Sequence, residues 1–306
     1  MTPPLYPRLE RAFKQAYLLP LTFLRYGTTR PHRARLHQSD NWIYIDPDDP
    51  CAIKKVVQEP LRGKVSSNLI FWREFNAHLQ PDLVVDVGLN YGECLFGTQY
   101  AANATLYGFE ANPRLIPYLE RSRQQHPAGA RITLTHCLVA DAPAEDVPFL
   151  VNPEWSGSSS AVRQMNATHR HIEFKLPART LDALIPAPVA TGKTLLFKMD
   201  IEGYESRALA GFTATLARVQ HAFGFIEFTP QFMQWAGVVP EAFFARLRAQ
   251  FEVYCYASVK RRELWRLREY GDLLVRHGAA FTGTDLLLMP QRPSEQWLPP
   301  GWRVVS

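Results

Sequence analysis

The sequence contains few cysteines: Cys51, Cys94, Cys137 and Cys255 are the only four in 306 residues, and they lie far apart. No CxxC pair occurs, and no cysteine spacing typical of a metal site. We therefore expect reduced thiols in a cytoplasmic protein, without a disulfide framework.

Long apolar runs are also missing. The longest one near the N-terminus covers residues 16–24, is interrupted by Pro20 and Thr22, and falls far short of the roughly 20 residues that span a bilayer. No apolar segment typical of a secretory signal is present. No basic stretch with interleaved aromatic residues occurs either, so we do not expect nucleic acid as a partner.

The sequence is rich in the material of a globular core, with 46% hydrophobic residues. Its length fits one large domain or two smaller ones. We expect an N-terminal helical and extended preface over residues 1–80, a main domain over 81–290 and a tail over 291–306.

Residues 1–40 differ from the remainder in charge, with seven Lys or Arg against two acidic residues. Leu5, Leu9, Phe13 and Tyr17 recur at every fourth position, which predicts a helical stripe. This helix either packs on the main domain or docks on a membrane surface or a partner.

Short apolar runs alternate with helical patterns from residue 83 onward. The runs that we interpret as strands cover residues 83–88, 106–110, 132–140, 195–201, 222–228, 251–257 and 284–290. Helices are expected near 91–102 and after Asn112-Pro113. The strand-like segment ELWRL between the last two runs predicts an antiparallel hairpin at the C-terminal edge. The pattern predicts a doubly wound, mostly parallel seven-stranded α/β sheet with a Rossmann-like arrangement.

The segment VVDVGLNYGE, residues 84–93, links the first of these strands to a helix, where open α/β sheets bind ligands. Gly88 and Gly92 permit a tight turn, and Asn90 tolerates a positive φ. Glu110 closes the second strand, where a carboxylate can accept both hydroxyls of a ribose. We therefore expect a cofactor that contains adenosine.

The turn does not match the G-x-G-x-x-G pattern of dinucleotide sites, because no third glycine follows at the required spacing. A nicotinamide-dependent oxidoreductase is therefore the weaker alternative. Asp86, which precedes the turn, suits a cofactor with a positive charge and an amino group. S-adenosylmethionine has both.

Three further segments follow in order: RTLDALI (179–185), FKMDIEGYESRALAGF (197–212) and FIEFTP (225–230). Together with VVDVGLNYGE and YGFEANP, they resemble the FkbM family of S-adenosylmethionine-dependent methyltransferases over residues 82–290. The K-x-D-x-E-G-x-E element is the most specific part of this resemblance, which implies a class I methyltransferase fold and O-methylation of a hydroxyl.

The resemblance also implies a set of cofactor contacts. The turn would hold the methionine end, and Glu110 the ribose. Cys137 and Leu138 would flank the adenine, and Asp141 is a weaker candidate there. The complete set of implied cofactor residues is Asp86, Gly88, Asn90, Gly92, Glu110, Ala111, Asn112, Cys137, Leu138 and Asp141.

Lys198, Asp200 and Glu202 alternate with apolar residues, so the three charges share one face at the end of the fourth strand. Our hypothesis is that Asp200 or Glu202 takes or orients the acceptor proton and that Lys198 tunes this carboxylate or binds the substrate. Glu227, at the end of the fifth strand, is a further candidate in the acceptor pocket.

Two alternatives remain for these acidic residues. They could form an ion-pair network that shapes the loop over residues 202–206, or the three carboxylates could hold magnesium or calcium. The leading interpretation uses no metal. It describes an enzyme that methylates a hydroxyl of a sugar, a natural product or another small molecule. A methyltransferase-like docking module without activity is the last alternative.

Two loop features remain open on the acceptor side. Trp155, Met233 and Trp235 follow strand ends, and either line an apolar pocket or pack beneath a loop. The polar segment 157–166 is either a substrate lid or a plain connection.

Overall fold

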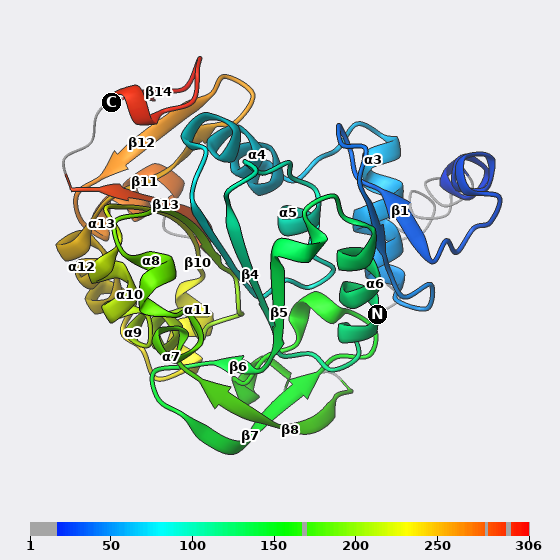
Figure 1. Ribbon diagram of the computed structural model, residues 1–306, viewed down its shortest axis with the longest axis horizontal. Coiled ribbons are helices and arrows are strands. Elements are labelled where there is room, and N and C mark those ends of the chain that lie inside the picture. The colour runs from blue at the N-terminus through cyan, green and yellow to red at the C-terminus, as the bar shows by residue number, and fades with distance from the viewer. Residues whose placement is uncertain (1–16, 167–169, 279–280, 292–294, 306) are drawn as a thin grey trace, which may run out of the picture.

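The computed structural model describes residues 17–166, 170–278, 281–291 and 295–305, and a nine-stranded sheet runs through its centre (Figure 1). The strand order is β14-β12-β11-β13-β10-β9-β3-β4-β5. The strands are β3 (Leu83–Val87), β4 (Thr105–Glu110), β5 (Ile132–His136), β9 (Thr194–Met199), β10 (His221–Phe228), β11 (Phe251–Ser258), β12 (Glu263–Leu267), β13 (Thr284–Pro290) and β14 (Arg303–Val305).

The expected α/β fold is confirmed. Strands β5, β4, β3, β9 and β10 are all parallel neighbours, and the chain reverses its winding direction between β3 and β9. The expected antiparallel hairpin near the C-terminal edge is formed by β11 and β12. In addition, β13 runs antiparallel to β10 and β11 and lies between them. The result is the expected seven-stranded sheet, extended by β12 and β14.

Helices cover both faces of the sheet (Figure 1). One face packs on α4 (Ser67–Leu79), α5 (Glu93–Phe96) and α6 (Ile116–Gln125). The opposite face packs on α7 (Leu181–Leu184), α8 (Ala187–Ala190), α9 (Glu205–Ala210), α10 (Thr213–Arg218), α11 (Pro230–Trp235), α12 (Pro240–Gln250) and α13 (Gly271–His277). Alternate side chains of β3 enter the two cores: Val84 faces the first set of helices, and Val85 faces the second.

Three local predictions differ from the structure. The run 132–140 divides at Cys137 into β5 and β6 (Leu138–Val139), because the chain leaves the main sheet there. The helix expected over 91–102 is the four-residue α5, which ends at Gly97. The helix expected from Asn112 starts one turn later, at Ile116, after a turn that the Asn112 carbonyl closes with Leu115.

A second sheet was not predicted. It consists of β6, β8 (Ile172–Arg179) and β7 (Ala144–Val151), and it lies beneath the main sheet in Figure 1. Its hydrophobic contacts form a separate small core that includes Leu138, Phe149 and Leu176. Short 3₁₀ turns occupy Gly129–Arg131, Ser156–Ser158, Arg163–Asn166 and Glu295–Trp297. All four cysteines are free, as expected.

The preface packs beside α6 and contributes to the first core. It contains a helix over residues 17–26, β1 (Arg33–Arg35), β2 (Trp42–Tyr44), α2 (Pro50–Ala52), the π-helical stretch η1 (Ile53–Gln58) and α3 (Glu59–Leu61). The rest of the expected N-terminal stripe, Leu5, Leu9 and Phe13, lies outside the described residues. No described helix combines the length and apolarity needed to cross a membrane.

Candidate active site

A cleft of about 1160 Å³ opens where the parallel strands β3, β4, β9 and β10 reach their carboxyl ends. This is the edge at which open α/β sheets bind ligands. Most of the predicted site residues line it, and segments of the preface close one side. Its volume exceeds that of a typical pocket for one small ligand, about 300–1,000 Å³, so two ligands fit together.

Glu110 anchors one end of this cleft. Its carboxylate lies at the end of β4, where Oε2 accepts a hydrogen bond from the Asn90 backbone N–H at 2.8 Å and Oε1 accepts one from the Asn112 N–H at 2.7 Å. The side chain is buried, and burial raises the pKa of Glu110 to about 7. Each oxygen keeps a further lone pair for a ligand hydroxyl.

The turn after β3 has the backbone that its glycines predict. Gly88, Asn90 and Gly92 all have positive φ, at 80°, 50° and 76°. A Cβ atom on Gly88 would lie 2.0 Å from the Asp200 carbonyl oxygen, so only glycine permits the turn to approach the end of β9 this closely. Gly92 starts α5 and does not line the cleft.

Asp86 lies beneath this turn and is 1% exposed. Burial raises its pKa to about 6, against the opposing effect of Lys198. Its Oδ1 atom has no hydrogen-bond partner in the part of the chain that the structure describes. A buried carboxylate oxygen without a donor is costly, and an ammonium or N–H group of a ligand in the cleft would satisfy it.

The residues predicted beside the ribose, Ala111 and Asn112, and those predicted at the adenine, Cys137, Leu138 and Asp141, divide into two groups. Ala111, Cys137 and Leu138 line the cleft. Asn112 instead supports Glu110 through its backbone N–H, and Asp141 forms an ion pair with Arg207 at 3.6 Å. Neither Asn112 nor Asp141 is among the described residues of the cleft wall.

Lys198 connects the cofactor turn to the acidic end of β9. Its Nζ lies 3.2 Å from Asp200 Oδ2 and 3.7 Å from Asp86 Oδ1, and donates a hydrogen bond of 3.3 Å to the Gly88 carbonyl. Burial lowers its pKa, but the two carboxylates more than offset this effect, so the pKa of Lys198 lies above its ordinary value. The side chain therefore stays charged and fixes both loops.

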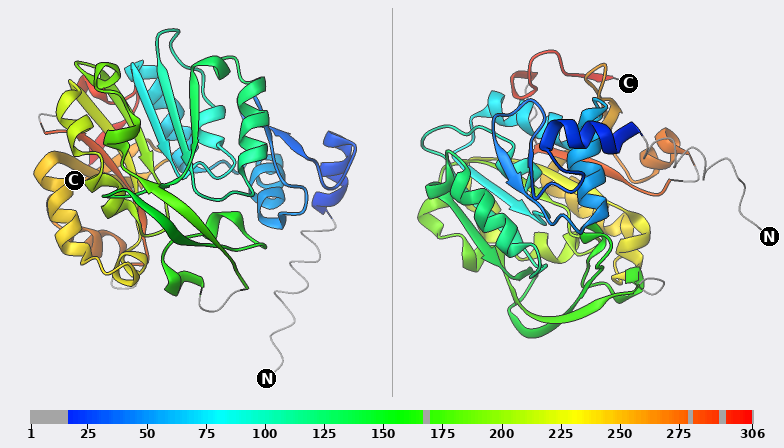
Figure 2. Two further views of the ribbon diagram at one scale, coloured as in Figure 1. Left: turned by 60° about the horizontal axis from the view of Figure 1, so that its bottom comes forward. Right: turned by 90° about the vertical axis from the view of Figure 1, so that its right-hand side faces the viewer.

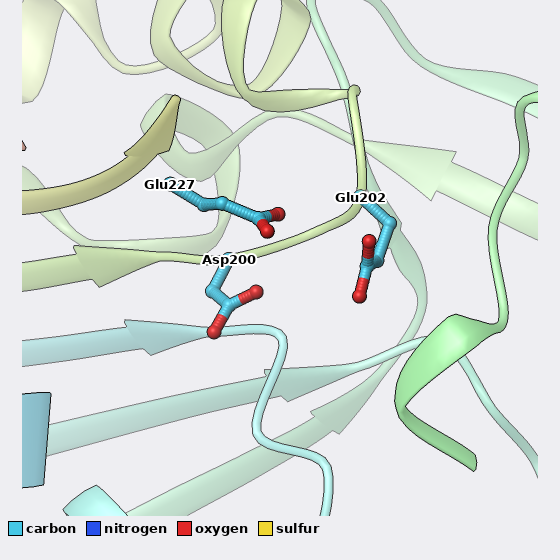
Figure 3. A group of neighbouring side chains, drawn as sticks. All are labelled: Asp200, Glu202 and Glu227. Atoms are coloured by element: carbon cyan, nitrogen blue, oxygen red, sulfur yellow. The ribbon is translucent and has the colours of Figure 1, made fainter. Parts of the chain in front are cut away.

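Asp200, Glu202 and Glu227 form what we call the carboxylate trio, and Figure 3 shows all three side chains directed toward one another. One oxygen from each lies within 4.8 Å of the others. Burial first, and then the neighbouring carboxylates, raise the pKa values of Glu202 and Glu227 well above their ordinary range. Carboxylates this close share protons or a cation, and oxygen ligands of this kind suit Mg²⁺ or Ca²⁺.

The loop that carries Glu202 is held in place by hydrogen bonds. Glu202 has a φ of 56°, which is uncommon outside glycine. The buried Glu205 carboxylate accepts backbone N–H bonds from Ile201 at 2.8 Å and Gly203 at 3.3 Å, and Ser160 Oγ donates to the Glu202 carbonyl at 3.0 Å. Glu205 therefore shapes the loop, while Asp200 and Glu202 are left to face the cleft.

The acceptor side includes residues that the sequence did not point to. Lys55, Asn68 and Asp285 line the cleft, and Lys55 Nζ lies 4.8 Å above the Trp155 ring. Asp285 pairs with Glu227 across β10 and β13. The sequence could not indicate this position, because a single acidic residue at the start of a strand is not a pattern of any site. Lys55 and Asn68 come from the preface, and only the fold brings them to the sheet edge.

The loop features left open by the sequence separate in the structure. Trp155 and residues 156–159 line the cleft. Met233 is buried in the second core, and Trp235 stacks on Phe232 at 5.7 Å. Of the three candidates Trp155, Met233 and Trp235, it is therefore Trp155 that lines the described cleft.

The family model of the methyltransferase FkbM domain matches residues 86–257. No curated protein sequence matches the chain. Among solved structures, methyltransferase FkbM from Methylobacillus flagellatus KT is 14% identical, with 68% of this chain and 44% of that chain covered and a TM-score of 0.37. The chain thus spans less than half of the Methylobacillus protein.

Two O-methyltransferases are similar to the same degree. TomG from Streptomyces achromogenes, solved in complex with SAM, is 10% identical, with 81% and 92% of the two chains covered and a TM-score of 0.39. The O-methyltransferase from Bacillus cereus, in complex with SAH, is 9% identical, with 74% and 82% covered and a TM-score of 0.36. Because these values are low, the assignment rests on the family model, which matches more than half of the 306 residues. The chain belongs to the FkbM family of S-adenosylmethionine-dependent methyltransferases.

Proposed function

We propose that this protein methylates a hydroxyl oxygen of a small molecule, such as a sugar or a natural product. The observation that carries this proposal is the carboxylate trio, which faces the same cleft as the cofactor turn and is joined to it by Lys198. Methylation of a hydroxyl needs a group that accepts a proton, and the trio supplies three candidates. Nothing in the cleft favours the oxidoreductase alternative.

The residues present fit S-adenosylmethionine. Glu110 keeps free lone pairs for the two ribose hydroxyls, and the buried Asp86 carboxylate, whose Oδ1 has Lys198 at 3.7 Å but no hydrogen bond, suits the ammonium group of the methionine end. Gly88 and Asn90 give the backbone its close approach, and Cys137 and Leu138 offer an apolar wall for the adenine. When bound, this cofactor supplies an electrophilic methyl group.

The chain's own residues then position the acceptor and hold its proton. The acceptor oxygen would gain its bond to the methyl carbon as the sulfonium–methyl bond breaks, with S-adenosylhomocysteine as the leaving group, and the acceptor's proton would pass to a carboxylate of the trio. Glu202 and Glu227 are the candidates to accept it, because a raised pKa makes the ionised carboxylate a stronger base. Asp200 is held by Lys198 at 3.2 Å, so we assign it to orientation of the acceptor.

The test replaces each trio member by its amide: Asp200→Asn, Glu202→Gln and Glu227→Gln. Calorimetric titration with S-adenosylmethionine, S-adenosylhomocysteine and NADH measures cofactor affinity. Transfer of a labelled methyl group to a panel of polyols, sugars and polyketides measures turnover. We expect each variant to bind the methyl cofactors like the wild type, and the variant that lacks the base to lose about 10²–10⁴-fold in kcat.

The matched control is Glu241→Gln, which removes an exposed carboxylate on α12, outside the cleft. It should change neither affinity nor turnover. Normal turnover in all three trio variants would overturn the base assignment. Tight cofactor binding without transfer to any acceptor would favour the alternative of an inactive docking module, and NADH binding would overturn the methyltransferase function.

A further inference from the structure

The N-terminal helix, residues 17–26, exposes apolar side chains where a surface helix is normally polar. Its exposed large side chains include Leu24 at 80%, Tyr17 at 63% and Phe23 at 56%, and Leu19 and Pro20 are exposed beside them. The opposite side of the helix is already occupied, because Leu18 and Thr22 are buried. Figure 2, right, shows this helix on the outside of the molecule.

The exposed residues form one continuous face. With about 100° per residue, the order around the helix is Leu19, Phe23, Pro20, Leu24 and Tyr17, which covers an arc of roughly 160°. Every member of this set, which we call the outer apolar face, is apolar or aromatic. A helix that is apolar on both sides needs a second apolar contact beyond the one its own domain supplies.

The charge around this face is of one sign. The segment 17–39 contains four arginines and no aspartate or glutamate. Arg25 is exposed one turn position beyond the Tyr17 edge of the outer apolar face and has no ion-pair partner among the described residues, and Arg33 is exposed above the Trp42 ring. Arg30 and Arg35 are neutralised by Asp48 and Asp40. Arg25 is therefore a cation without an ion-pair partner, among the described residues, on the helix that carries the outer apolar face.

We propose that the outer apolar face docks on an anionic lipid bilayer. Leucine and phenylalanine side chains insert below the headgroups, tyrosine sits at the interface, and flanking arginines bind lipid phosphates. This combination separates the candidate partners. Nucleic acid would use the arginines and leave the apolar side chains in water, and a second copy of this chain would place like charges against each other.

The test uses the full chain and vesicles made of equal parts phosphatidylglycerol and phosphatidylcholine, with pure phosphatidylcholine vesicles for comparison. Co-sedimentation should give binding to the anionic vesicles that weakens as salt is added. Leu24→Glu should reduce the partition coefficient at least about tenfold, since a leucine inserts and a glutamate is repelled. Arg25→Gln should reduce it about fivefold, and on the anionic vesicles alone.

The matched control is Val275→Glu on α13, where the side chain is 81% exposed and lies outside the N-terminal helix. It should bind like the wild type. Equal binding of wild type and Leu24→Glu, equal loss in both glutamate variants, or no binding to anionic vesicles would overturn the proposal. So would a dimer in light scattering that Leu24→Glu converts to a monomer. Thermal melting of each variant shows whether a loss of vesicle binding is caused by unfolding instead.

Discussion

Glu110 is buried at the end of β4, where a negative charge is costly. The proposed ligand, S-adenosylmethionine, nevertheless needs the ionised carboxylate. Burial raises its pKa to about 7, so the free protein holds a growing fraction of neutral Glu110 below neutral pH. Ribose hydroxyls donate stronger hydrogen bonds to a carboxylate than to a carboxylic acid. We therefore expect the affinity for S-adenosylmethionine to fall as the pH drops below 7, by at most about tenfold per pH unit.

Calorimetric titration across this pH range measures the effect. Glu110→Gln is the matched variant, because the amide has nearly the same shape and does not titrate. It should bind the cofactor more weakly at neutral pH and with a shallower pH profile, to which Asp86, with a pKa of about 6, still contributes. The same slope in both proteins would assign the titration to another group and contradict the ribose role of Glu110.

Gly88 shows how two elements constrain a single residue. The turn after β3 and the end of β9 approach so closely that a Cβ atom on Gly88 would lie 2.0 Å from the Asp200 carbonyl oxygen and 2.8 Å from an Ile201 methyl group. Gly88→Ala must therefore move the turn that holds the cofactor. We expect a loss of roughly 2–4 kcal/mol in the free energy of unfolding, from backbone strain plus overpacking.

Gly192 provides the control, because it has a φ of 70° and a Cβ atom there would meet nothing within 4 Å. Gly192→Ala carries the strain of a positive φ without the clash, so it should lose about 1 kcal/mol or less and keep full cofactor affinity. Chemical denaturation and calorimetry compare the two. Equal losses of stability in the two variants would mean that the close approach of the turn to β9 adds nothing to the cost of Gly88→Ala.

The elements that build the cofactor half of the site could be predicted because their signals are local. Val84 and Val85 belong to a continuous apolar run, which indicates a strand buried on both faces, and Gly88 with Asn90 indicates the turn behind it. The proposed ribose role of Glu110 follows from its position at a strand end. The structure places Gly88, Asn90 and Glu110 along one cleft.

The acceptor half could not be predicted, because its signals are long-range. Lys55 belongs to a π-helical stretch, and only the packing of the preface places it above Trp155. The second sheet was missed because β7 begins with three exposed residues, Ala144 and the acidic Glu145 and Asp146. Cys137 is followed directly by the apolar residues Leu138, Val139 and Ala140, and no glycine or proline marks the point where the chain changes sheets.

At the scale of the whole molecule, the active-site edge concentrates buried acids. Asp86, Glu110, Glu205 and Asp285 all have raised pKa values, at about 6, 7, 7 and 6, each mainly through burial. In the unfolded chain these groups lose their protons near pH 4. Between about pH 4 and pH 7, these groups therefore bind protons more tightly in the folded protein than in the unfolded chain.

This difference predicts how stability depends on pH. A raised pKa contributes stability at low pH that is lost as the pH rises through the folded value, and here that value is about 7 for Glu110 and Glu205. Burial lowers the pKa of His126, so this group makes the free energy of unfolding rise with pH. It does so only below its ordinary pKa of 6.5. From about pH 6.5 to 8.5 we expect the free energy of unfolding to fall by roughly 1–2 kcal/mol.

Urea denaturation at several pH values in this interval measures the slope, and Glu110→Gln identifies its source. The variant lacks one of the titrating carboxyls, so its slope should be smaller than that of the wild type. Bound S-adenosylmethionine should reduce the slope as well, because hydroxyl donors stabilise the ionised form of Glu110 and lower its pKa. A free energy of unfolding that rises with pH would mean that the folded protein keeps these acids ionised, and the burial argument for the site would then be wrong.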